Sequence, residues 1–141
     1  MKKLLKVLVI VSGLLFLLAG AFKFLTPAPG GSTLEGQRAF AQALSQLGVP
    51  IPVVMAALIP ALEVVGGIGL ISGKGRKLWA LLLALDMIGA IFLVGLPGKS
   101  GRGITVGTAT IGAESWRLPL EIGLLLLMLY VLFLPSVENT V

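Results

Sequence analysis

The chain has 141 residues, of which 57% are hydrophobic and 12% are charged, and its formal net charge is +5. Soluble domains carry about 25% charged residues, and so short a chain has too little interior for so many apolar side chains. Composition therefore excludes an ordinary soluble domain and predicts a membrane protein. Because the sequence contains no cysteine or histidine, we expect no metal site and no covalently bound cofactor.

The first predicted element is a transmembrane helix over about residues 4–25, since about 20 helical residues span the hydrocarbon. Its basic start and the run Ala19-Gly20-Ala21 also resemble a secretory signal peptide with an A-x-A cleavage site. The apolar stretch is longer than the apolar region of a signal peptide, which has roughly 7 to 15 residues. We therefore favour a helix that stays in the membrane.

A short amphipathic helix is predicted over about residues 33–47. Ser32 and Glu35 have the spacing of a capping box, apolar side chains recur at helical spacing after it, and Gly48 and Pro50 end the pattern. We expect this helix to lie on the outer membrane surface. There it either packs over the mouth of the bundle or forms a lid on a site that faces the lipid.

Two further membrane helices are predicted over about residues 51–73 and 78–96. The short turn between them carries Lys74, Arg76 and Lys77, and the first helix begins with further lysines. The positive-inside rule places both basic segments, and hence both termini, in the cytoplasm. The basic residues lie beside membrane ends, where they meet anionic headgroups, and no nucleic-acid-binding motif accompanies them. We therefore expect a multi-pass protein of the cytoplasmic (inner) membrane.

The last predicted helix covers about residues 118–134. In the connection before it, residues 97–117, the segment ITVGTATIG alternates as a strand does and favours a small hairpin, although it identifies no partner. The expected fold is an all-α, polytopic membrane four-helix bundle, a single domain over residues 1–141, with the amphipathic helix between its first two membrane helices.

Two acidic residues lie near the middle of predicted membrane helices. Glu63 shares a helix stripe with Pro60, Gly66 and Gly67, and Asp86 lies at similar depth on the next helix. An ionised acid at the centre of a membrane helix costs about 2.5–3.5 kcal/mol on insertion scales. With no basic residue expected at that depth, we predict that Glu63 carries a proton. The pair either forms structural hydrogen bonds or makes a site for a proton, a quinone headgroup or a substrate.

A second polar group is predicted nearer the outer surface. Lys23 ends the first membrane helix, while Arg117 and Glu121 begin the last one, so the three could form one network. Alternatively, Lys23 and Arg117 extend separately to the outer interface.

Two motifs carry a resemblance to a known family. The first membrane helix ends in G-x-x-K, and the second contains L-E-x-x-G-G-x-x-L-x-x-G. Over about residues 12–92 the chain resembles the DoxX family of small four-helix membrane proteins. The residues at motif positions are Gly20, Lys23, Glu63, Gly66, Gly67 and Gly73. The resemblance implies association with membrane redox systems, including subunits of quinol-oxidising complexes and partners of thiol and superoxide defence enzymes.

The resemblance thus implies an accessory or quinone-interacting subunit of an envelope redox system, and we do not expect the chain to be catalytic on its own. Its expected partners are the lipid bilayer, redox-enzyme subunits and a second copy of the chain; its expected ligand is a quinone or a lipid, and no nucleic acid is expected. One alternative is a small proton-coupled transporter that uses Glu63 and Asp86. Another is a non-catalytic membrane assembly factor.

Overall fold

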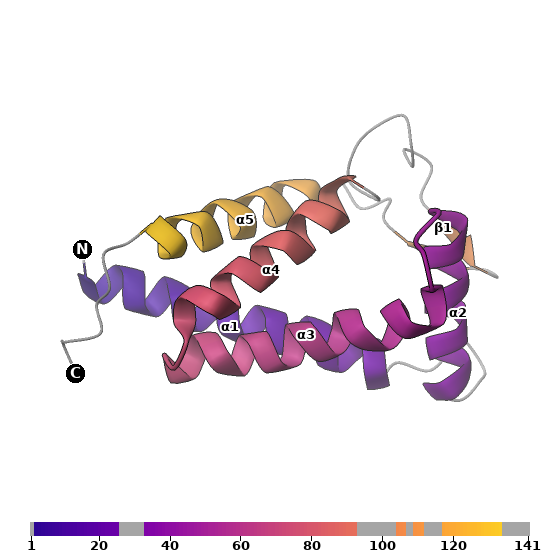
Figure 1. Cartoon of the computed structure of the whole chain (residues 1–141), viewed down its shortest axis with the longest axis horizontal. Coiled ribbons are helices and arrows are strands. Elements are labelled where there is room, and N and C mark those ends of the chain that lie inside the picture. Colours follow the sequence, from indigo (N-terminus) through magenta and orange to yellow (C-terminus); the bar gives the residue numbers. More distant parts are fainter. Residues whose placement is uncertain (1, 26–32, 93–103, 107–108, 112–116, 134–141) are drawn as a thin grey trace.

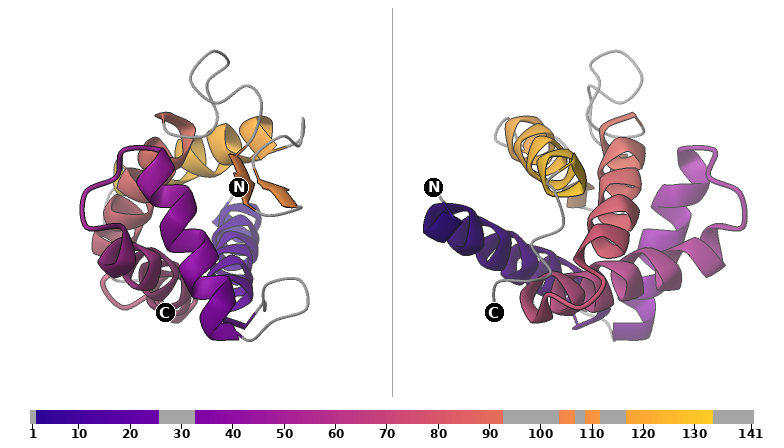
Figure 2. Two further views of the ribbon diagram at one scale, coloured as in Figure 1. Left: turned by 90° about the vertical axis from the view of Figure 1, so that its right-hand side faces the viewer. Right: turned by 60° about the vertical axis from the view of Figure 1, so that its left-hand side comes forward.

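The computed structural model describes residues 2–25, 33–92, 104–106, 109–111 and 117–133 (Figure 1). These residues form five helices and a two-stranded hairpin, so the predicted helical class is confirmed. The helices are α1 (Lys2–Leu25), α2 (Thr33–Gln46), α3 (Pro52–Ser72), α4 (Arg76–Ala90) and α5 (Arg117–Phe133); the strands are β1 (Ile104–Val106) and β2 (Ala109–Ile111). The four long helices, α1, α3, α4 and α5, run lengthwise, and α2 lies across one end of them (Figures 1 and 2).

Two of the described helices are long and apolar enough to cross a membrane, over Lys3–Leu25 and Pro52–Ser72. The apolar part of α5, Pro119–Phe133, is shorter. Helix α4 has 15 residues and continues for two more in a wider, π-helical turn, and the rest of the predicted 78–96 helix lies outside the described residues. Helix length alone therefore supports two of the four expected spans.

The predicted hairpin in ITVGTATIG is confirmed. Strands β1 and β2 pair antiparallel, with Ile104 opposite Ile111 and Val106 opposite Ala109. Strand β1 lies against α2, which brings this connection to the same end of the molecule as the crossing helix. The predicted capping box of Ser32 and Glu35 lies outside the residues whose side chains are described.

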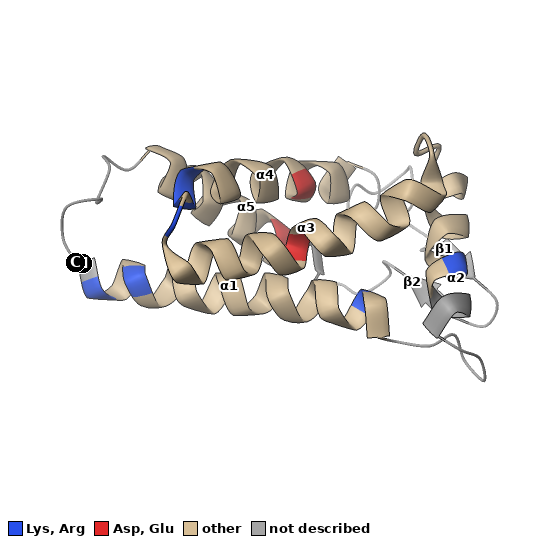
Figure 3. Cartoon of the chain, turned by 60° about the horizontal axis from the view of Figure 1, so that its bottom comes forward, with Lys and Arg blue, Asp and Glu red and all other residues tan. Residues whose placement is uncertain are grey.

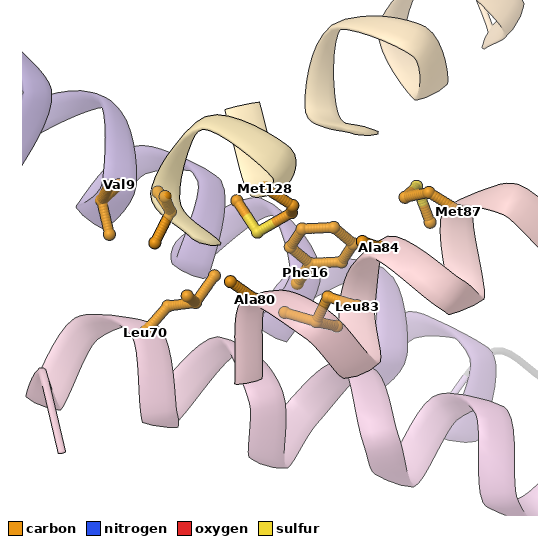
Figure 4. Close-up of a cluster of buried hydrophobic side chains, with 9 residues drawn as sticks. Val9, Phe16, Leu70, Ala80, Leu83, Ala84, Met87 and Met128 are labelled. Atoms are coloured by element: carbon orange, nitrogen blue, oxygen red, sulfur yellow. The ribbon is translucent and has the colours of Figure 1, made fainter. Parts of the chain in front are cut away.

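The four long helices share one apolar core (Figure 4). Phe16 of α1 lies among Leu83 and Ala84 of α4 and Met128 of α5, and Leu70 comes from α3. The buried members are Val9, Phe16, Leu70, Ala80, Leu83, Ala84, Met87, Met128 and Val131. Many other large apolar side chains point outward on the same helices, as expected of surfaces that lipid covers.

Helices α1 and α3 pack closely because glycines replace side chains between them. A Cβ added at Gly67 would lie 2.5 Å from the carbonyl oxygen of Gly13, and one added at Gly20 would lie 2.5 Å from that of Pro60. Small residues permit such close approach between membrane helices. Seven residues forward on α1 correspond to seven residues back on α3, so these contacts define an antiparallel register.

A second, smaller core attaches α2 to α3. Ala41 and Leu44 of α2 are buried against Ala56 of α3, with Phe40 and Ile59 packed beside them. The crossing helix is thereby held over the beginning of α3 and the end of α1.

Candidate functional site

An ion pair joins α1 to α3 inside the molecule. The Nζ of Lys23 lies 2.5 Å from Oε1 of Glu63. The Glu63 side chain is only 3% exposed, whereas 31% of the Lys23 side chain is exposed. The acid is therefore enclosed by the protein, and the base reaches it from a partly open position. Figure 3 marks the acidic and basic positions along the helices.

This pair corrects the expectation that no base reaches the depth of Glu63. Lys23 is in the last turn of α1, but side chains of a helix lean toward its N-terminus, and a lysine side chain is long. One turn earlier, Gly20 admits α3 so closely that its added Cβ would lie 2.9 Å from Cβ of Glu63. The prediction that Glu63 lacks a basic partner is wrong, and with it falls the argument that Glu63 must carry a proton.

Helix α2 contacts Lys23 at two points. The side-chain amide of Gln37 donates a hydrogen bond of 2.8 Å to the carbonyl oxygen of Lys23, one of the acceptors that a helix end leaves free. The Phe40 ring centroid lies 6.0 Å from the Lys23 Nζ, at the limit of a cation–π contact. Both the backbone and the amine of Lys23 are thus contacted from one turn of α2.

Two more carboxyl groups complete the arrangement. Asp86 of α4 is half-buried and interacts electrostatically with Glu63, Lys23 and Glu121. Glu121 of α5 is buried, with 7% of its surface exposed. We call Lys23, Glu63, Asp86 and Glu121 the polar cluster; it draws one residue from each of the four long helices.

The polar cluster unites two groups that the sequence predicted separately. Glu63 and Asp86 interact, as expected from their depth, while Lys23 pairs with Glu63 and belongs to the same cluster as Glu121. The side chain of Arg117, the third member of the predicted outer network, lies outside the described residues. Sequence reasoning missed Gln37 and Phe40; their one-turn spacing on the amphipathic helix was the only available signal.

The glycines on the Glu63 stripe serve packing. Gly66 faces Leu83 of α4, and Gly67 faces the backbone of Gly13. Pro60 is buried one turn before Glu63, and because proline has no N–H it leaves the carbonyl of Ala56 without its helical donor. Of these candidates, Pro60 borders the polar cluster, whereas Gly66 and Gly67 determine how closely the neighbouring helices approach.

The polar cluster offers groups for hydrogen bonding and proton exchange. Oε2 of Glu63 is buried and has no hydrogen-bond partner among the described residues. The described part of the chain contains no group of three or more acidic residues placed to hold a metal ion. The partly exposed amine of Lys23 adds a donor beside these acceptors.

Apolar helices that enclose a small polar cluster define this chain as a small helical protein of the membrane type. The sequence model of the DoxX family matches residues 5–96. The chain belongs to the DoxX family, and its family and apolar helices together indicate a membrane protein. No curated protein and no solved structure gives a significant match. The family match includes Lys23, Glu63 and Asp86, and Glu121 lies beyond it.

Proposed function

We propose that the chain is a multi-pass protein of the cytoplasmic (inner) membrane, with both termini in the cytoplasm, in which four helices form the bundle. The lysine-rich start of α1 and the basic α3–α4 turn support this orientation. Reporter fusions after residues 75, 100 and 141 test it. Cytoplasmic reporters should be active after residues 75 and 141 and inactive after residue 100; activity after residue 100 alone would reverse the orientation.

We further propose that it acts as a quinone-interacting, accessory subunit of an envelope redox system. The observation that carries this proposal is the Lys23–Glu63 pair, because a partly exposed amine is joined there to a buried carboxylate. The amine is a suitable donor to a quinone carbonyl oxygen. Glu63 and Asp86 lie where they can exchange the protons that accompany quinone reduction.

The chemistry divides between this chain and a partner. A quinone becomes a quinol by taking up two electrons and two protons. The polar cluster supplies a route for the protons, and a redox enzyme associated with the chain supplies the electrons. Under this division the chain is an accessory subunit rather than a complete enzyme.

Quinone binding in lipid nanodiscs tests the proposal. The native chain should retain a short-chain quinone, and Lys23→Met should weaken its binding about tenfold or more because the donor is lost. Glu63→Gln should preserve most of the binding, but when a chemical reductant supplies the two electrons it should abolish the proton uptake that accompanies quinone reduction, since an amide cannot titrate. Arg38→Gln, on an exposed position of α2, is the matched control. A native chain that binds quinone no better than Lys23→Met would contradict the proposal.

The surplus of acids favours a second function, a small proton-coupled transporter. Two carboxyls, those of Glu63 and Asp86, interact with the one amine of Lys23, and a bound proton would relieve the excess negative charge in apolar surroundings. This function predicts solute-dependent proton movement in proteoliposomes that contain no quinone. Loss of that movement in Asp86→Asn, with quinone binding absent from the native chain, would select it over the redox role.

A further inference from the structure

The turn between α3 and α4 gathers positive charge away from the polar cluster. Lys74 and Lys77 are exposed, and Arg76 is half-buried between them. The antiparallel register of α1 and α3 brings the exposed Lys6 level with Lys74, so α1 adds charge at the same end (Figure 3). All acidic side chains that the structure describes belong to the polar cluster. We call residues 73–77 the basic turn.

Arg76 has a buried donor that no described residue uses. Its Nε is enclosed and has no hydrogen-bond partner among the described residues. One terminal nitrogen of its guanidinium would lie 3.0 Å from a Cβ added at Gly73, so the side chain folds back across the turn. Arg76 as a whole is only half-buried, and the N–H groups of an arginine form a rigid fork that suits an acceptor with two oxygens.

The backbone of the basic turn adds further donors. Gly73 and Gly75 have φ of 79° and 62°, which lets the chain reverse direction within a few residues. Helix α4 then begins at Arg76, with Gly75 as its N-cap residue, no side-chain cap hydrogen bond and no acidic residue in its first turn. The first N–H groups of α4, which belong to the basic turn, therefore have no capping carboxylate. Such helix N-termini attract anions.

We propose that the basic turn binds the phosphate group of an anionic phospholipid. The inference rests on the membrane placement proposed above and is independent of the quinone chemistry. A turn between two membrane helices lies at headgroup depth, where lipid phosphates are the abundant two-oxygen acceptors. Arg76 binds the phosphate through its fork, and Lys74 and Lys77 attract the negatively charged headgroup.

Lipid titration with native mass spectrometry in mild detergent tests this site. The native chain should bind phosphatidylglycerol at least about tenfold more tightly than phosphatidylcholine. Arg76→Gln should remove most of that preference, and Arg76→Lys should retain part of it, because lysine keeps the charge but loses the fork. Arg38→Gln removes an exposed cation at the opposite end of the molecule, and this variant should bind both lipids as the native chain does.

Further measurements distinguish a lipid phosphate from a free phosphate ion, and the lipid proposal from the quinone proposal. Inorganic phosphate at millimolar concentration should not displace the phosphatidylglycerol; displacement would show a free-anion site and overturn the lipid assignment. Equal binding of both lipids, or equal losses in Arg76→Gln and Arg38→Gln, would also overturn it. Lys23→Met should leave lipid preference unchanged while it weakens quinone binding, so failure of either proposal is seen without the other.

Discussion

The two faces of α3 use glycine against different kinds of partner. Toward α1, Gly67 meets the backbone of Gly13. Toward α4, Gly66 meets the side chain of Leu83, and Gly69 meets the ring of Trp79. A backbone cannot move aside without shifting its helix, whereas the end of a side chain can change rotamer.

This difference separates a rigid half of the bundle from an adaptable one. The α1 face fixes the register that places Lys23 on Glu63, and the Glu63 carboxylate depends on that register for its partner. The α4 face brings Asp86 to the same cluster across side-chain contacts rather than backbone contacts. Substitutions on the two faces should therefore have unequal effects.

The largest effect is expected from removing the base of the ion pair. Lys23→Met leaves Glu63 buried without its partner and should lower the free energy of unfolding by about 3 kcal/mol, at the low end of measured losses for broken buried pairs. Glu63→Gln should cost about 1 kcal/mol, because the amide oxygen still accepts from Lys23 and the partly exposed lysine stays solvated. Denaturant titration in mild detergent measures both. Equal losses would mean that the two partners are equally enclosed, contrary to their exposures.

A methyl group on the α1 face should have the next largest effect. Gly67→Ala places a Cβ against two backbone atoms of α1, and overpacking of this kind costs about 2 kcal/mol. The control is Gly89→Ala, where nothing lies within 4 Å of the added Cβ. That variant should be neutral or stabilising by up to about 1 kcal/mol through helix propensity. If the two variants unfold alike in the same titration, the backbone contact is not limiting.

Gly20→Ala should link the packing to the ion pair. Its added methyl would meet the Pro60 carbonyl oxygen and Cβ of Glu63, so α3 must move away from the turn that carries Lys23. A double-mutant cycle between Gly20→Ala and Lys23→Met should give a coupling of about 1 kcal/mol, as for other residues in contact. A coupling near zero would show that the pair forms independently of the helix spacing.

The smallest effect is expected on the α4 face. Gly66→Ala brings a methyl 3.0 Å from the side-chain atoms of Leu83, which must shift by a few tenths of an ångström to admit it. The helix-propensity gain of about 1 kcal/mol offsets that adjustment, so stability should change by less than about 0.5 kcal/mol. A loss as large as that of Gly67→Ala would remove the distinction between the two faces.

The sequence patterns predicted the helices and strands better than they predicted the contacts between them. Long apolar runs indicated the helices, and alternation in ITVGTATIG indicated the hairpin, because both signals are local. Axial depth alone put Lys23 near the outer surface and left Glu63 without a base. It omitted the length of the lysine side chain and the space that Gly20 opens. Whether these bring Lys23 to Glu63, 40 residues further along the chain, depends on the register of α1 and α3.

The glycines of the Glu63 stripe show the same limit. Their small size correctly indicated close helix approach, but a sequence does not say which neighbour each glycine meets. Gly66 and Gly67 are adjacent and face different helices. The contacts from α2 to Lys23 could not be predicted from the sequence either, because they depend on how α2 packs across the end of the bundle.

The two holds of α2 on Lys23 have a mechanical consequence. Gln37 and Phe40 lie one helical turn apart, and one contacts the backbone of Lys23 while the other faces its amine. A rotation of α2 about its axis would therefore disturb both contacts, which couples the position of α2 to the Lys23–Glu63 pair. Arg38 lies exposed on that same turn. A spin label at position 38 would therefore register rearrangements of the Lys23–Glu63 pair from outside, without touching either residue.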